Sequence, residues 1–212
     1  MFVKNKSLIN WLTLLGLAGV IFYFLHVFIG KINYPDYDFL RQAVSDLTAA
    51  DAPSREIASS LSTVYAIFTA AGCLILSIFF HDKETKLFRL GIYLFTIMQW
   101  LSAVGYTLFP LTSSGYAGEF QDIMHMVVTV LVVLLSIVSM ILISIACTRE
   151  KKHKLLGIIT IVSLSLMFLG SIGTGIVPEN YFGIPERISV YSVVIYTGFL
   201  SLFAFTFKVA ND

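Results

Sequence analysis

Six apolar runs, each about 20 residues long, constrain the fold of this chain more than any other feature of its sequence. A helix that crosses the roughly 30 Å hydrocarbon core of a bilayer needs about 20 mainly apolar residues. The runs predict transmembrane helices at about 8–29, 57–80, 89–109, 123–147, 155–177 and 188–207. Of the 212 residues, 57% are apolar and only 13% are charged, which is about half the charged fraction of a soluble domain. We therefore expect an all-α, polytopic membrane protein whose residues 1–212 form a single domain.

The charged residues between the runs are distributed unequally on the two sides of the membrane. The amino terminus, the loops at 81–89 and 148–154 and the tail carry ten Lys and Arg residues, against four on the other side. Acidic residues show the opposite bias, with four against nine. Because cytoplasmic loops are enriched in Lys and Arg, this pattern predicts a multi-pass protein of the cell membrane with both termini in the cytoplasm. The first run is too long for a signal peptide and lacks a cleavage site, which indicates an uncleaved first span.

A glycine followed five residues later by a proline recurs three times, as GKINYP at 30–35, GYTLFP at 105–110 and GTGIVP at 173–178. Each glycine falls in the last turn of an odd-numbered run, and each proline falls just beyond it. One interpretation is an internal repeat that arranges the six helices as three hairpins. The alternative is that proline simply ends helices and that glycine is common in membrane spans.

The 30–56 segment is too long for a simple hairpin loop. Apolar residues recur in it at helical spacing, and Asp38 is placed to cap a helix. The apolar positions are Phe39, Leu40, Ala43, Val44 and Leu47. We expect a short amphipathic helix over about 38–48 on the extracytoplasmic surface or across the mouth of the bundle.

Polar residues in or near the membrane are costly to bury and are therefore candidates for function. Those on the extracytoplasmic side suggest a pocket that binds a lipid headgroup or a small amphiphile. Candidate ligand-binding residues are Asp38, Arg41, Ser45, Asp46, His125, Glu186 and Arg187. In this hypothesis Arg41 and Arg187 contact anionic groups, while His125 and Asp46 orient the ligand. The alternative is that the arginines pair with carboxylates on the same side and brace the loop helix on the bundle.

Two histidines and an aspartate on the same side suggest a second hypothesis, a metal-dependent membrane hydrolase. His26 lies near the outer end of the first run, and His125 lies three residues after Asp122 in the fourth. Zinc takes imidazole and carboxylate ligands, and bound zinc activates water. However, the sequence contains no H-x3-H or H-E-x2-H spacing. The alternative is that these histidines form structural hydrogen bonds.

A third hypothesis is a structural or accessory subunit whose acidic outer surface meets a partner. The expected partners are membrane lipids and either another membrane protein or a second copy of the chain. The KKHK run is explained by the bias of cytoplasmic loops and does not predict nucleic-acid binding. The GSIGTG stretch lies inside an apolar run and does not follow a strand, so it does not predict a nucleotide-binding loop. The sequence identifies no particular cofactor, and the cofactor is therefore unknown.

Four short motifs resemble a known family. YPDYDFLRQAVSDL follows the first run, LFP closes the third, DIMH opens the fourth and GIPERI opens the sixth. Together they resemble the prokaryotic membrane family catalogued as domain of unknown function 998, which implies a six-span integral membrane protein with no established activity. The matching positions are Asp38, Arg41, Ser45, Asp46, Pro110, His125, Glu186 and Arg187. This chain has Leu111 and Thr112 after LFP, where the family pattern implies an acidic residue.

Overall fold

The computed structural model describes residues 6–151 and 153–207, and within them it contains helices and no strand. The helices are α1 (Leu8–Leu12), α2 (Leu15–Ile32), α3 (Arg55–Phe80), α4 (Lys86–Leu108), α5 (Phe120–Arg149), α6 (Lys154–Gly173) and α7 (Gly183–Thr206). Two short 3₁₀ helices, η1 (Val44–Thr48) and η2 (Glu179–Tyr181), lie between them. With α1 and α2 counted as one span, six segments are long and apolar enough to cross a membrane. The predicted all-α class and the six spans are thus confirmed.

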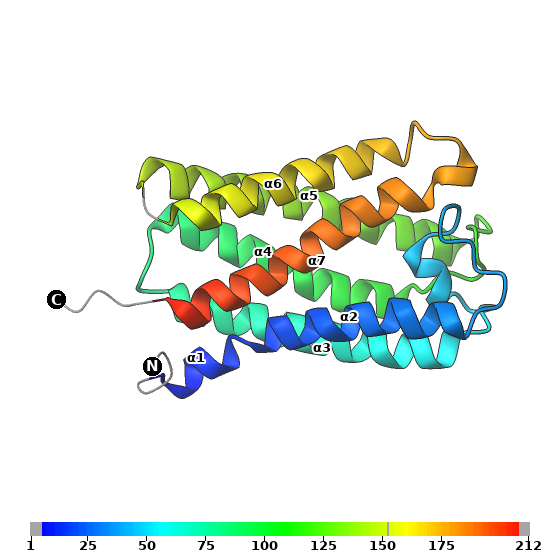
Figure 1. Cartoon of the computed structure of the whole chain (residues 1–212), viewed down its shortest axis with the longest axis horizontal. Helices are drawn as coiled ribbons and strands as arrows, with labels where there is room; N and C mark the ends of the chain where they lie inside the picture. The colour runs from blue at the N-terminus through cyan, green and yellow to red at the C-terminus, as the bar shows by residue number, and fades with distance from the viewer. Residues whose placement is uncertain (1–5, 152, 208–212) are drawn as a thin grey trace.

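The long helices pack as three consecutive hairpins (Figure 1). Contacts are most extensive within the pairs α2–α3, α4–α5 and α6–α7, and less extensive where one hairpin meets the next. Helix α2 also contacts α7, so the first and last spans lie against each other. The predicted arrangement in three hairpins is therefore confirmed.

The repeated glycine has the same role in each hairpin. A Cβ atom on Gly30 would lie 3.3 Å from Ala58, one on Gly105 would lie 2.7 Å from Val128, and one on Gly173 would lie 2.7 Å from Pro185. In each case the neighbour belongs to the second helix of the same hairpin. The glycines therefore let the two helices approach closely where the chain leaves the first of them.

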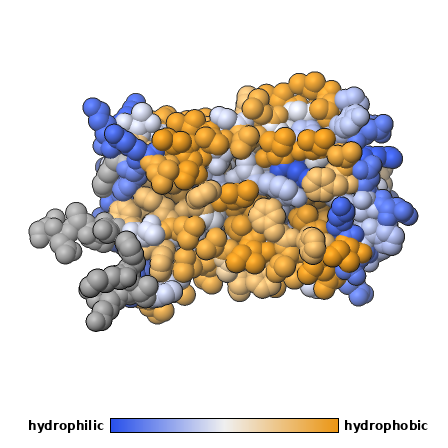
Figure 2. Space-filling view, in the orientation of Figure 1, coloured by the Kyte–Doolittle hydropathy of each residue, from blue (hydrophilic) through white to orange (hydrophobic). Residues whose placement is uncertain are grey.

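The two ends of the bundle differ. The loop end carries the segments 33–54, 109–119 and 174–182. The terminal end carries the turn at 81–85, the last residues of α5, the first residues of α6 and the two ends of the described chain (Figure 1). At the terminal end, Lys6 donates a hydrogen bond to the Phe205 carbonyl. Figure 2 shows an apolar band between hydrophilic ends, as a bilayer requires.

Several element boundaries differ from the predicted ones. Of the predicted helix over 38–48, only the 3₁₀ helix η1 forms, and the residues before it form turns. The carbonyls of Leu40 and Gln42, which an α-helix would use internally, instead accept hydrogen bonds from Gly183 N and from the Arg187 side chain. Helix α7 begins five residues earlier than expected, because a proline in the first turn of a helix costs no hydrogen bond.

Candidate functional site

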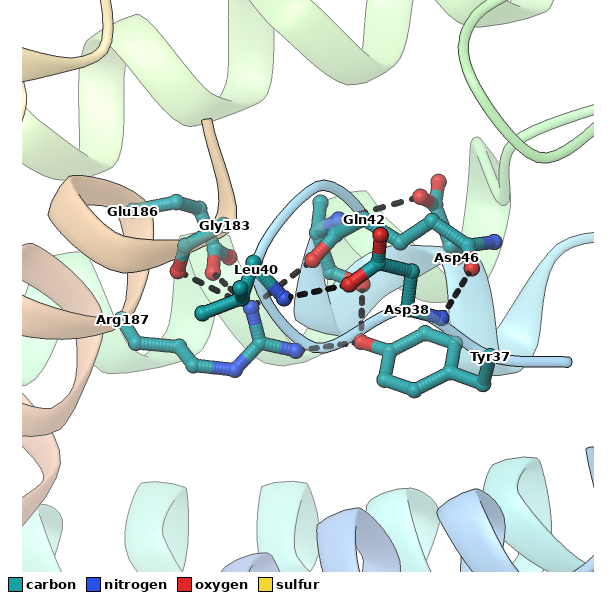
Figure 3. A network of polar contacts seen from close by, with 9 residues as sticks. Tyr37, Asp38, Leu40, Gln42, Asp46, Gly183, Glu186 and Arg187 are labelled. Carbon is teal, nitrogen blue, oxygen red and sulfur yellow. Dashed lines mark hydrogen bonds and ion pairs between the residues drawn. The ribbon is translucent and has the colours of Figure 1, made fainter. Parts of the chain in front are cut away.

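At the loop end, the Arg187 side chain extends from the first turn of α7 to the 37–43 segment (Figure 3). Its Nη1 donates hydrogen bonds to the carbonyls of Gln42 at 2.7 Å and Gly183 at 2.9 Å, and its Nη2 donates to the Tyr37 hydroxyl at 2.5 Å. The guanidinium also lies 3.9 Å from the centre of the Phe39 ring. Arg187 is only 3% exposed and joins α7 to the loop, as the bracing alternative predicts, although its partners are carbonyls and a phenol.

The start of α7 is shaped for this contact. Gly183 N donates to the Leu40 carbonyl at 2.8 Å. A Cβ atom on Gly183 would lie 2.5 Å from the Phe39 carbonyl oxygen and 2.6 Å from that of Gln42, so a larger residue would push the loop away. The GIPERI motif therefore supplies a glycine for close approach, a helix start and the arginine that binds the loop.

Two buried polar atoms in this cluster have no hydrogen-bond partner among the described residues. They are Glu186 Oε2 and Arg187 Nε. Glu186 Oε2 lies 4.0 Å from Arg187 Nη1, and the Glu186 side chain is 15% exposed. A buried donor or acceptor without a partner costs roughly 1–3 kcal/mol. The cluster therefore contains one acceptor and one donor that are each buried without a hydrogen bond to the described residues.

Asp46 connects η1 to the 109–119 segment. Its carboxylate accepts hydrogen bonds from Ala43 N at 3.0 Å and from Gly115 N at 3.2 Å. Burial raises the pKa of the Asp46 carboxyl, while these two N–H donors and the Arg187 charge act in the opposite direction. In the same region, the Gln42 amide donates to the Ser114 hydroxyl at 2.8 Å. The 37–48 segment is therefore held on both sides, by α7 and by the α4–α5 loop.

His125 and Asp122 hold the other side of that loop. His125 Nδ1 donates to the Phe109 carbonyl at 2.8 Å. Asp122 accepts from both the backbone N–H and the hydroxyl of Thr112, and from Glu119 N at 3.3 Å. These bonds are those that the structural alternative predicts. Asp122 and His125 thus fix the α4–α5 loop at the start of α5.

The histidine of the first span also forms a hydrogen bond within the protein. His26 is buried, and its Nδ1 donates to the Tyr23 carbonyl at 2.8 Å. In residues 6–151 and 153–207, no group of three or more His, Cys, Asp or Glu side chains is arranged to hold a metal ion. The described residues therefore offer the zinc hypothesis no ligand set.

The predicted ligand-binding residues come together only in part. Asp46, Glu186 and Arg187 gather at the loop end (Figure 3), and His125 lies within electrostatic range of Asp46. Arg41 is exposed, and its side chain has no hydrogen bond or ion pair within the described chain. The Asp38 carboxylate accepts from Leu40 N at 2.9 Å and shapes the turn.

Sequence reasoning did not identify three residues of this cluster, Tyr37, Gln42 and Gly183. The Tyr37 hydroxyl accepts from Arg187 and donates to the Ala43 carbonyl at 2.6 Å, so it extends the network into the loop. Tyr37 and Arg187 are 150 residues apart in the chain. No local pattern indicates such a pairing. The only signal in the sequence was that Tyr37, Gln42 and Gly183 all lie inside the quoted motifs.

The apolar band, the six spans and the closed polar cluster at one end define a polytopic helical membrane protein. The model of the family described as "Protein of unknown function (DUF998)" matches residues 17–203, and the chain belongs to that family. This confirms the resemblance inferred from the four motifs. No curated protein and no solved structure matches the chain.

Proposed function

We propose that the protein binds the headgroup of a lipid or a small amphiphile at its loop end. One observation carries the proposal: Glu186 Oε2 and Arg187 Nε, which belong to adjacent residues, are both buried without a hydrogen-bond partner in the described chain. Inside a membrane protein such atoms are expensive, because neither water nor lipid tails replace the missing hydrogen bonds. A ligand that satisfies both atoms would recover that energy.

The chemistry of the cluster favours a neutral, hydroxyl-bearing headgroup over an anionic one. The Nη1 and Nη2 groups of Arg187 already donate to protein oxygens, so an anion would have to displace them. A hydroxyl both donates and accepts, which matches the free Glu186 oxygen and the free Arg187 N–H. Arg187 therefore contributes one donor, rather than the anion-binding fork expected from the sequence.

An aromatic wall lies beside the cluster and would accept the apolar part of the ligand. The Tyr23 ring packs edge-on against Tyr65 at 4.9 Å and against Tyr191 at 6.0 Å between ring centroids. Glu186 lies within electrostatic range of Tyr23. Tyrosine presents an apolar ring with a polar tip, which suits the boundary between a headgroup and its chain.

A matched pair of substitutions tests this site. Glu186→Gln replaces the buried carboxylate by an amide of similar size, whereas Glu179→Gln removes an exposed charge from the same end. We expect the first to lower the amount of lipid or amphiphile that remains bound through mild detergent purification, since it removes a charge-assisted acceptor, roughly a fivefold loss. The second should leave that amount unchanged. Native mass spectrometry counts the bound molecules, and equal retention by both variants and the parent would contradict the proposal.

We further propose that the loop end faces outward across the cell membrane and that both termini are cytoplasmic. The bias of Lys and Arg toward the terminal end supports this orientation. Both native cysteines are buried, so an introduced cysteine can be labelled with little background. On intact cells, a membrane-impermeant maleimide should label Ala117→Cys at the loop end and spare Lys151→Cys at the terminal end. The reverse pattern would show the opposite orientation.

A further inference from the structure

A shallow groove lies between α3 and α4 at the terminal end, which is the opposite end of the bundle from the loop-end cluster. It consists of two adjoining hollows of about 430 and 360 Å³ that share His81 and Tyr93. The other lining residues are Ser77, Ile78, Asp82, Lys86, Arg89 and Leu90. Nothing in the proposed function uses this groove.

The outer lip of the groove is basic. The Lys86 side chain is exposed and has no hydrogen bond or ion pair within residues 6–151 and 153–207. The Arg89 guanidinium donates to the His81 carbonyl, which holds it at the lip. Asp82 is the one carboxylate among the lining residues, and its side chain is almost fully exposed. Two cations with one solvated carboxylate give the lip a net positive charge.

The inner side of the groove is apolar and continues into the lipid-facing surface. Ile78 is 55% exposed and Leu90 is 47% exposed. His81 Nδ1 lies 2.8 Å from the Tyr93 hydroxyl, which places a tyrosine between the charged lip and the apolar side. Tyrosine is enriched at membrane–water interfaces because its ring is apolar and its hydroxyl is polar. The groove thus changes from basic at the end of the bundle to apolar along the sides of α3 and α4.

We propose that this groove binds an anionic phospholipid of the leaflet at the terminal end. The phosphate contacts Lys86 and Arg89, because both side chains donate charge-assisted hydrogen bonds to phosphate oxygens. An acyl chain lies along Ile78 and Leu90. The bilayer is the source of the ligand, since a soluble phosphate would gain nothing from the apolar side. Each basic residue near a membrane surface raises the affinity for anionic lipids about fivefold.

The test compares two double variants that remove the same charge from the same end. Lys86→Gln with Arg89→Gln alters the lip, whereas Lys151→Gln with Lys154→Gln removes two exposed cations outside the groove. The full chain is placed in nanodiscs of equal parts phosphatidylcholine and phosphatidylglycerol. Native mass spectrometry then measures the ratio of the two lipids that stay bound. We expect the first double variant to lower the ratio of bound phosphatidylglycerol to bound phosphatidylcholine roughly thirtyfold and the second to leave it unchanged.

A third variant separates binding from folding. Ile78→Trp fills the groove without changing any charge, and it replaces an exposed side chain that faces lipid. It should lower phosphatidylglycerol retention while the thermal unfolding midpoint in detergent stays at the parent value. Equal loss in both double variants would indicate diffuse attraction to the whole basic end and would overturn the proposal. Unchanged retention in Ile78→Trp would overturn it as well.

Discussion

Replacing Arg187 with methionine should lower the free energy of unfolding by about 3–5 kcal/mol, the range found when one partner of a buried charge pair is removed. The substitution keeps much of the length and apolar stem of the side chain. However, it removes the side-chain donor that binds the Gln42 and Gly183 carbonyls and the Tyr37 hydroxyl. It also leaves the Glu186 carboxylate without a nearby cation. Equilibrium unfolding in mixed micelles measures the loss, and faster amide exchange in the 37–43 segment should accompany it.

Arg41→Met is the matched control, because Arg41 belongs to the same loop but is exposed. Surface substitutions of this kind usually change stability by less than about 0.5 kcal/mol. A large difference between the two variants would locate the anchor of the loop at Arg187. Equal effects would show that the loop is held by other contacts, such as those of Asp46.

The second large effect is expected at Gly170, where α6 lies against the backbone of α7. A Cβ atom there would meet the backbone N of Ser189, and it would lie 2.5 Å from the Pro185 carbonyl oxygen and 2.8 Å from the Ser189 Cα. Backbone atoms of a packed helix cannot move aside as a flexible side chain can. Gly170→Ala should therefore lower the free energy of unfolding by about 3 kcal/mol, the upper part of the range for overpacked interiors.

Gly175→Ala provides the comparison for this prediction. A Cβ atom on Gly175 would lie no closer than 3.6 Å to a neighbouring atom, which is ordinary contact. The substitution should change the free energy of unfolding by less than about 0.5 kcal/mol. Mixed-micelle unfolding of both variants measures the difference. If Gly170→Ala were as stable as Gly175→Ala, the two helices would not be in backbone contact at this depth.

Much of the fold follows from local sequence patterns, and the reason is physical. A helix that crosses a membrane must satisfy its own backbone hydrogen bonds, so a long apolar run allows few alternatives. This is why the six spans could be predicted from composition alone. The hairpin arrangement was also readable, because Gly30, Gly105 and Gly173 mark the sites where the paired helices meet.

The segment between the first two spans was harder to predict. Its helical spacing of apolar residues suggested an amphipathic helix over 38–48. In the structure, Gly183 and Arg187 take the carbonyls of Leu40 and Gln42, so only η1 remains helical. The local helix propensity of this segment was overridden by hydrogen-bond donors more than 140 residues away in the chain. No pattern within the segment indicates such donors.

The candidate site, too, could be predicted from the sequence only in part. The sequence identified Asp46, Glu186 and Arg187 as costly polar residues near the membrane, and the structure places all three at the loop end (Figure 3). It also grouped Arg41 with Arg187, but only tertiary packing decides that one arginine is exposed and the other buried. Tyr37 could not be recognised, because its role depends on the distance between its hydroxyl and a side chain of α7.

By itself, the sequence determined the class of the protein, its six spans, their pairing and the family to which it belongs. Those features depend on hydropathy, charge and short motifs, each of which acts over a few turns of helix. Only the tertiary structure decided that Arg187 binds the loop and that Glu186 Oε2 and Arg187 Nε are buried without a hydrogen-bond partner among the described residues. Hydrogen bonds act over about 3 Å, so their presence depends on distances that arise only after the helices have packed.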